Sequence, residues 1–153
     1  FLNVSEHTLQ SDVIFKAWWR VVRDIAKNHS SRLVIEITEG IQDASLALRW
    51  EALTEIGVEL ALDDYGDKSS SLERLSRYDW HYCKFDARRL RSLEDYSAIL
   101  HCRRKGIQLI AEQVESFPLG ESAKLLGLSW QQGFYHGKPA VMEKHLNYVK
   151  ALP

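Results

Sequence analysis

Short apolar segments that end in acidic residues alternate with amphipathic segments along this chain, and this alternation limits the fold more than any other feature. The apolar segments are rich in β-branched residues, as strands are, whereas the amphipathic segments repeat apolar residues at helical spacing. The acids at the ends of four segments, Glu36, Asp63, Asp86 and Glu112, recur about every 25 residues, the length of one strand–helix unit. Near-continuous apolar strands of this kind predict an α/β protein with a parallel sheet covered by helices.

The pattern predicts six strands and six helices in a single domain over residues 1–153. The strands are expected at residues 1–4, 33–40, 58–62, 80–85, 107–112 and 128–132. The helices are expected at residues 12–28 (capped by Ser11 or Asp12), 43–56, 70–76 (capped by Ser70), 92–105, 119–126 and 142–152. A closed (β/α)₈ barrel usually needs about 200 residues or more, so the chain is either an open doubly wound sheet or a piece of a barrel.

The composition limits the classes of partner that the chain is expected to bind. The net charge of −1, with 45% apolar and 27% charged residues, is ordinary for a globular protein and predicts neither a DNA or RNA duplex nor a membrane surface as a partner. The two cysteines, Cys83 and Cys102, are expected to be buried thiols in a reducing, cytoplasmic compartment. The chain opens on a strand without an initial Met, and we expect it to begin inside a domain whose preceding region can include a membrane anchor.

Polar residues gather at the expected carboxyl ends of the strands, where α/β proteins carry their functional sites. They are Asn3, Glu36, Glu39, Asp63, Asp64, Lys84, Asp86, Glu112, Glu115 and Gln132. Most offer oxygen ligands, which favour Mg²⁺, Mn²⁺ or Ca²⁺ over zinc. Four or more carboxylates with one lysine fit a two-metal phosphoester hydrolase. The alternative is that each acid caps a helix or lies solvated in a loop.

Six short motifs along the whole chain, in this order, resemble those of the EAL-domain family of cyclic di-GMP phosphodiesterases. They are Asn3-Val4-Ser5, Glu36-Ile37-Thr38-Glu39, Asp63-Asp64-Tyr65-Gly66 with Ser70-Ser71-Leu72, Lys84-Phe85-Asp86, Ala111-Glu112-Gln113-Val114-Glu115, and Gln132-Gly133-Phe134 with Lys138-Pro139. The resemblance implies a modified TIM barrel, incomplete at its N-terminal strands, that uses two Mg²⁺ or Mn²⁺ ions to hydrolyse cyclic di-GMP to linear pGpG.

The resemblance also implies a role for each matching residue. Asn3, Glu36 and Asp63 would hold one metal ion, and Asp63, Asp64 and Glu112 would hold the other. Lys84 would contact the attacking water, and Glu39 would brace the loop after Asp64. Glu115 and Gln132 would contact the substrate or the residues that support it.

Three departures from the family pattern limit what the resemblance implies. The E-A-L signature on an earlier strand is absent, Gly66-Asp67-Lys68-Ser69 replaces G-T-G-x, and Gln113 replaces a glycine. We therefore expect impaired hydrolysis by this chain alone. The alternative hypothesis is a degenerate EAL-like domain that binds cyclic di-GMP or a protein partner without hydrolysis. Because an open barrel exposes strand edges, a homodimer is also expected.

Overall fold

The structure, a computed structural model, describes residues 1–28, 32–55, 57–67 and 71–139. Its strands are β1 Leu2–Val4, β2 Val34–Ile37, β3 Glu59–Leu62, β4 Tyr82–Asp86, β5 Gln108–Glu112 and β6 Trp130–Gln131. Its helices are α1 Glu6–Gln10, α2 Asp12–Asn28, α3 Asp43–Glu55, α4 Leu72–Arg77, α5 Leu93–Lys105 and α6 Phe117–Leu125. No helix in these ranges has both the length and the apolarity that a membrane crossing requires.

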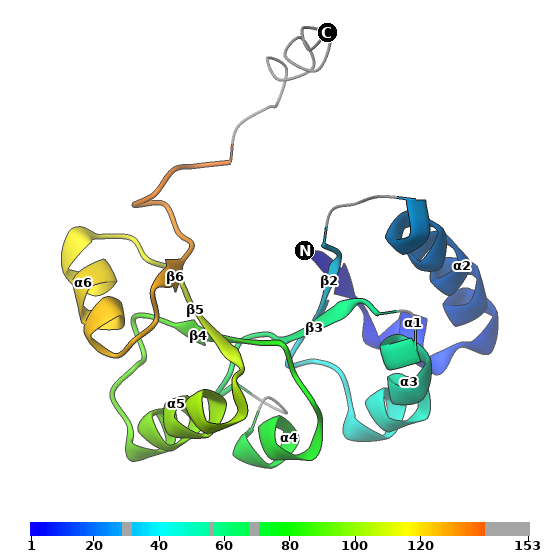
Figure 1. Cartoon of the computed structure of the whole chain (residues 1–153), viewed down its shortest axis with the longest axis horizontal. Helices are drawn as coiled ribbons and strands as arrows, with labels where there is room; N and C mark the ends of the chain where they lie inside the picture. Colours follow the sequence, from blue (N-terminus) through cyan, green and yellow to red (C-terminus); the bar gives the residue numbers. More distant parts are fainter. Residues whose placement is uncertain (29–31, 56, 68–70, 140–153) are drawn as a thin grey trace, which may run out of the picture.

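The six strands form one parallel sheet in which each strand pairs with the next one in the sequence. Figure 1 shows the helices from α2 to α6 in a curved row along the outside of this sheet. A doubly wound sheet would reverse its strand order at a switch point and carry helices on both faces. The sequential order and the single row of helices therefore identify a piece of a (β/α) barrel, whose sheet is not closed: among the described residues, β1 and β6 are edge strands.

The two faces of the sheet have different neighbours. Ile35, Leu60 and Cys83 belong to the large core that the helices complete. The side chains of alternate residues point to the opposite, concave face, where four of them form a separate small apolar cluster. These four are Val34, Ala61, Tyr82 and Ile110. Two residues further along each of these strands, the concave face becomes charged.

Several helix ends have visible causes. Ser92 and Asp95 form a capping box at the start of α5, and Gly106 ends the helix at φ 74°. Gly57, after α3, has φ 72°. The sequence predicted that these two glycines end their helices. Cys83 and Cys102 are buried free thiols, as expected.

Other boundaries differ from the prediction. Helix α1, which was not predicted, begins after Ser5, whose hydroxyl accepts a hydrogen bond from the Thr8 N–H at 3.2 Å. The cap of α4 is Ser71, one residue after the predicted Ser70. Strand β2 ends at Ile37, where Thr38 starts a turn closed by the Ile41 N–H, and β6 has only two residues. Ser70 itself, Ile56 and the helix predicted at 142–152 lie outside the described residues.

Candidate active site

Lys84 lies at the centre of the charged part of the concave face. Its Nζ is 2.8 Å from Asp63 Oδ1 and 2.7 Å from Glu112 Oε1, and it also donates a hydrogen bond to Glu36 Oε1. The lysine is only 3% exposed, and the three carboxyl groups are buried around it. Adjacent strand registers bring these residues together, because Glu36, Asp63, Lys84 and Glu112 each stand two positions beyond a residue of the small apolar cluster.

The buried charges of this arrangement shift the pKa values of its side chains. Burial disfavours a charged lysine, but hydrogen bonds to Asp63, Glu112 and Glu36 outweigh burial and raise the pKa of Lys84. Burial, opposed by the Lys84 ammonium and reinforced by the Asp63 carboxylate, raises the pKa of Glu112 to about 7. Burial and the carboxylates of Asp63 and Glu39 raise the pKa of Asp64. One lysine therefore leaves an excess of negative charge, which favours the binding of a further cation.

The residues that could hold such a cation are Asp63, Asp64 and Glu112. Each offers one carboxylate oxygen, and the three oxygens lie within 4.8 Å of one another. All are hard oxygen ligands, the type that Mg²⁺, Mn²⁺ and Ca²⁺ prefer. The donor set therefore fits a divalent cation beside Lys84, as the sequence predicted.

The other predicted site residues lie around this cluster. Gln132 Nε2 donates a hydrogen bond of 2.5 Å to Glu112 Oε1. Asn3 is exposed on β1 and pairs in register with Glu36. Glu39 belongs to the turn after β2 rather than to the strand, yet its negative charge helps to raise the pKa of Asp64. Glu115 is exposed and lines a cavity next to Glu112.

That cavity, of about 810 Å³, is open and lies between the ends of β5 and β6. Besides Glu112, Glu115 and Gln132, its lining includes Phe134, His136 and Lys138. An aromatic ring can stack on a base and a lysine can pair with a phosphate, so this lining suits a nucleotide. Sequence reasoning named none of these three as site residues, although the last motif contains Phe134 and Lys138.

Asp86, by contrast, is a strand-end acid that does not join the cluster. Its carboxylate accepts hydrogen bonds from the Arg88 side chain, at 2.7 Å from Nη2, and from the Arg88 N–H at 2.9 Å. Burial would raise the pKa of Asp86, but the contacts with Arg88 outweigh it and lower the pKa. A structural ion pair therefore accounts for this acid.

Gln113, where the family motif has glycine, has a backbone φ of 52°. This left-handed conformation costs an L residue about 1 kcal/mol, and glycine adopts it freely. We expect Gln113→Gly to leave the free energy of unfolding unchanged or slightly raised, because relief of strain offsets the greater entropy of the unfolded glycine. Urea denaturation measures this.

Gln108, at the start of β5, is the matched control. Its N–H donates to the His81 carbonyl within the sheet, so its extended backbone gains nothing from glycine. Gln108→Gly should lower the free energy of unfolding by about 0.5–1 kcal/mol. Equal losses in the two variants would contradict the strain at Gln113.

Known proteins share this sequence pattern. A sequence model of the EAL domain matches residues 1–139. The chain is similar to the cyclic di-GMP phosphodiesterase PdeF of Escherichia coli, with 29% identity over 134 residues, which are 79% of this chain and 18% of PdeF. It is also similar to the bifunctional diguanylate cyclase/cyclic di-GMP phosphodiesterase MucR of Pseudomonas aeruginosa, with 33% identity over 143 residues, 84% of this chain and 21% of MucR. The chain thus spans about a fifth of the length of either relative.

Solved structures share the fold. The phosphodiesterase PaMucR in complex with c-di-GMP has 28% identity and a TM-score of 0.71, over 92% of this chain and 61% of that chain. The EAL domain of Mycobacterium smegmatis DcpA has 27% identity and a TM-score of 0.71, over 91% of this chain and 67% of that chain. Bacillus subtilis YkuI, solved with c-di-GMP and calcium, has a TM-score of 0.76, over 90% of this chain and 36% of that chain, and at 24% identity shows likeness of fold alone.

Proposed function

The chain belongs to the EAL domain family, and from this premise we propose that it carries the metal-dependent active site of a cyclic di-GMP phosphodiesterase, which hydrolyses cyclic di-GMP to linear pGpG. The observation that carries the proposal is the buried Lys84 ammonium in contact with Glu36, Asp63 and Glu112, with Asp64 beside them. A merely structural lysine needs one counter-charge, whereas this cluster retains carboxylates for a cation.

We assign the metal ligands as the family pattern implies. Asn3, Glu36 and Asp63 would hold one Mg²⁺ or Mn²⁺ ion, and Asp63, Asp64 and Glu112 would hold the second. When bound, the ions would supply a hydroxide at neutral pH and neutralise the charge that develops on the phosphate. The proposed ligands lie on β1, β2 and β5 and directly after β3, and the continuous pairing from β1 to β5 would keep them in a fixed arrangement.

The remaining residues would act on the attacking water, on the substrate or on the loop after Asp64. Lys84 would orient the attacking water and stabilise the transition state through its ammonium. Glu39, in the turn before α3, would brace the loop after Asp64. Glu115 and Gln132 would contact cyclic di-GMP in the cavity beside Glu112, and the Gln132–Glu112 hydrogen bond would keep that carboxylate aimed at the metal.

A second candidate function is binding of cyclic di-GMP or a protein partner without hydrolysis. The strained backbone of Gln113, directly after Glu112, favours it, as does the replacement of the usual loop glycine after Gly66. The retained carboxylates count against it, because a binding module has no physical need for a costly cluster of buried acids.

Titration of the protein with Mn²⁺ separates the two functions. We expect pGpG formation that rises with Mn²⁺, stops with EDTA and returns when Mn²⁺ is restored. Because β1 and β6 are edge strands within the described residues, turnover by this chain is expected to be slow, so the assay needs a long incubation and radiolabelled substrate. Binding of cyclic di-GMP that survives EDTA, with no pGpG formed, would favour the binding module instead.

Two further assignments complete the proposal. A homodimer would cover the edge strands of the open sheet, and light scattering at several protein concentrations tests it. A cytoplasmic location fits two buried free thiols and a nucleotide substrate.

A further inference from the structure

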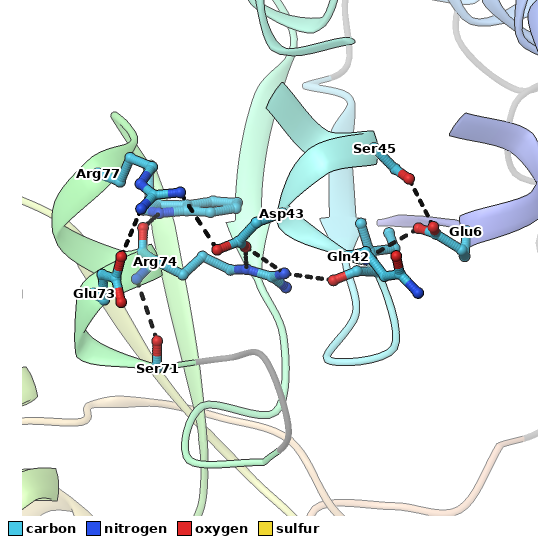
Figure 2. A network of polar contacts seen from close by, with 10 residues as sticks. Glu6, Gln42, Asp43, Ser45, Ser71, Glu73, Arg74 and Arg77 are labelled. Carbon is cyan, nitrogen blue, oxygen red and sulfur yellow. Dashed lines mark hydrogen bonds and ion pairs between the residues drawn. The ribbon is translucent and has the colours of Figure 1, made fainter. Parts of the chain in front are cut away.

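Arg74, in α4, joins two connections that border the candidate active site. Its Nε donates a hydrogen bond of 2.7 Å to Asp43 Oδ1, and its Nη2 donates to the Ile41 carbonyl (Figure 2). The side chain is 0% exposed, which is rare for an arginine. Both acceptors belong to the β2–α3 connection or the first residue of α3.

That connection carries Glu39. The Ile41 N–H donates to the Thr38 carbonyl at 3.2 Å and so closes the turn that contains Glu39. Arg74 therefore holds the last residue of this turn by its carbonyl. Glu6 of α1 holds the same connection from the other side, because its carboxylate accepts hydrogen bonds from the Gln42 N–H at 3.1 Å and the Ser45 hydroxyl at 2.6 Å (Figure 2).

The helix that bears Arg74 follows the second connection, whose described residues include Asp63 and Asp64 near its start and Ser71 at its end. Ser71, at the end of that connection, caps α4 by accepting the Arg74 N–H at 3.3 Å. On the far side, Trp80 Nε1 donates to the Arg74 carbonyl at 3.2 Å. Arg74 thus contacts the end of the first connection through its side chain and the end of the second through its backbone N–H. One residue therefore links the two ends.

The arrangement is a costly way to stabilise a fold. A guanidinium removed from water pays a desolvation penalty that one ion pair often fails to offset. Among the described residues, Arg74 Nη1 has no hydrogen-bond partner, which adds to the cost. An apolar side chain of similar length would fill the space more cheaply, so the polar contacts matter for the geometry they impose.

We propose that Arg74 is a positioning residue for the cation site, which holds the Glu39 turn against α4, the helix that follows Asp63 and Asp64 in the chain. This inference rests on the proposed metal-dependent function and adds a residue about which the family motifs say nothing. Arg74 touches neither the cation ligands nor the cavity beside Glu112, so it acts through the two connections.

The test compares Arg74→Met with Arg77→Met. Arg77 reaches the same Asp43 carboxylate, at 3.5 Å, and also pairs with Glu73, but it is half-exposed, and within the described part of the chain its ion pairs are with those two acids. Binding of Mn²⁺, measured by electron paramagnetic resonance of the free ion, is the main readout. We expect Arg74→Met to weaken Mn²⁺ binding about tenfold, Arg74→Lys to recover part of the loss, and Arg77→Met to stay within twofold.

Thermal unfolding of the same variants separates positioning from stability. Unchanged Mn²⁺ affinity in folded Arg74→Met, whatever its unfolding midpoint, would overturn the proposal. If Arg74→Met does not fold, Asp43→Ala, which removes the carboxylate that Arg74 contacts and keeps the Ile41 contact, must show the loss of Mn²⁺ affinity instead. An unsubstituted protein that binds Mn²⁺ without forming pGpG would overturn the proposed hydrolysis alone, whereas one that binds no Mn²⁺ would overturn both.

Discussion

Replacing Lys84 with methionine is expected to lower the hydrolysis of cyclic di-GMP by about a thousandfold, the effect of losing one preorganised charged donor. Methionine has a similar length and no charge, so it fills the space at the floor of the site and removes only the ammonium. The loss should appear in kcat rather than in KM, because Lys84 is proposed to act on water and the transition state. Quantification of pGpG over time measures it.

The same variant should bind divalent cations at least as tightly as the unsubstituted protein. In the structure the Lys84 ammonium contacts Asp63 and Glu112, two of the three carboxylates that could hold a cation. Removing the ammonium leaves three buried carboxyl groups without their shared cation, which should lower the free energy of unfolding by about 3 kcal/mol or more in EDTA. Mn²⁺ should restore much of that loss, because it binds the folded state.

Lys124→Met is the matched control for Lys84→Met. Lys124 is exposed and pairs with Glu121 at 2.7 Å on α6, so its loss should change neither hydrolysis nor Mn²⁺ binding measurably. A Lys84→Met protein with more than a tenth of the original kcat would contradict the role that we propose for the ammonium in the chemistry.

The residues at the strand ends could be predicted from the sequence because two local rules were enough. Periodicity of two along a strand sends Glu36 to the same face as Val34, and parallel strands bring their carboxyl ends to one edge of the sheet. The neighbouring family motifs then named the chemistry. The helix ends at Gly57 and Gly106 followed from the left-handed backbone that glycine permits.

What the sequence could not predict depends on registers and on long-range contacts. The simultaneous contact of Lys84 with three carboxyl groups needs the registers of four strands at once. Arg74 lies 31 residues from Asp43 in the chain, and its place in α4 resembles that of any surface arginine. Helix α1 has only five residues, too few for an apolar period, and depends on the cap by Ser5.

Replacing Asp63 with asparagine is expected to weaken Mn²⁺ binding on the order of a hundredfold and to reduce pGpG formation to the background rate. Asp63 is the one ligand that the proposal assigns to both ions, and its carboxylate also contacts Lys84. An amide keeps the shape but removes the charge, so both positions lose affinity together. Calorimetric titration with Mn²⁺ measures the first effect, and the pGpG assay the second.

The fold should tolerate this change. The Asp63 charge raises the pKa of both Glu112 and Asp64, so removing it relieves repulsion between buried acids while Lys84 keeps its other two carboxylate partners. Urea denaturation should therefore show a free energy of unfolding close to that of the unsubstituted protein in EDTA. Loss of Mn²⁺ binding in a folded variant then reports on the site itself.

Asp67→Asn makes the same chemical change four residues further along the same connection and is the control for Asp63→Asn. Asp67 is half-buried and pairs with Arg89, and it is not one of the three carboxylates that could hold the cation, so its replacement should change Mn²⁺ binding less than threefold. Equal losses in the two variants would mean that the connection as a whole, and not Asp63, governs the cation. If Asp63→Asn alone loses binding, the Asp63 carboxylate is the charge that the two cation positions share, and the neighbouring Asp64 cannot replace it.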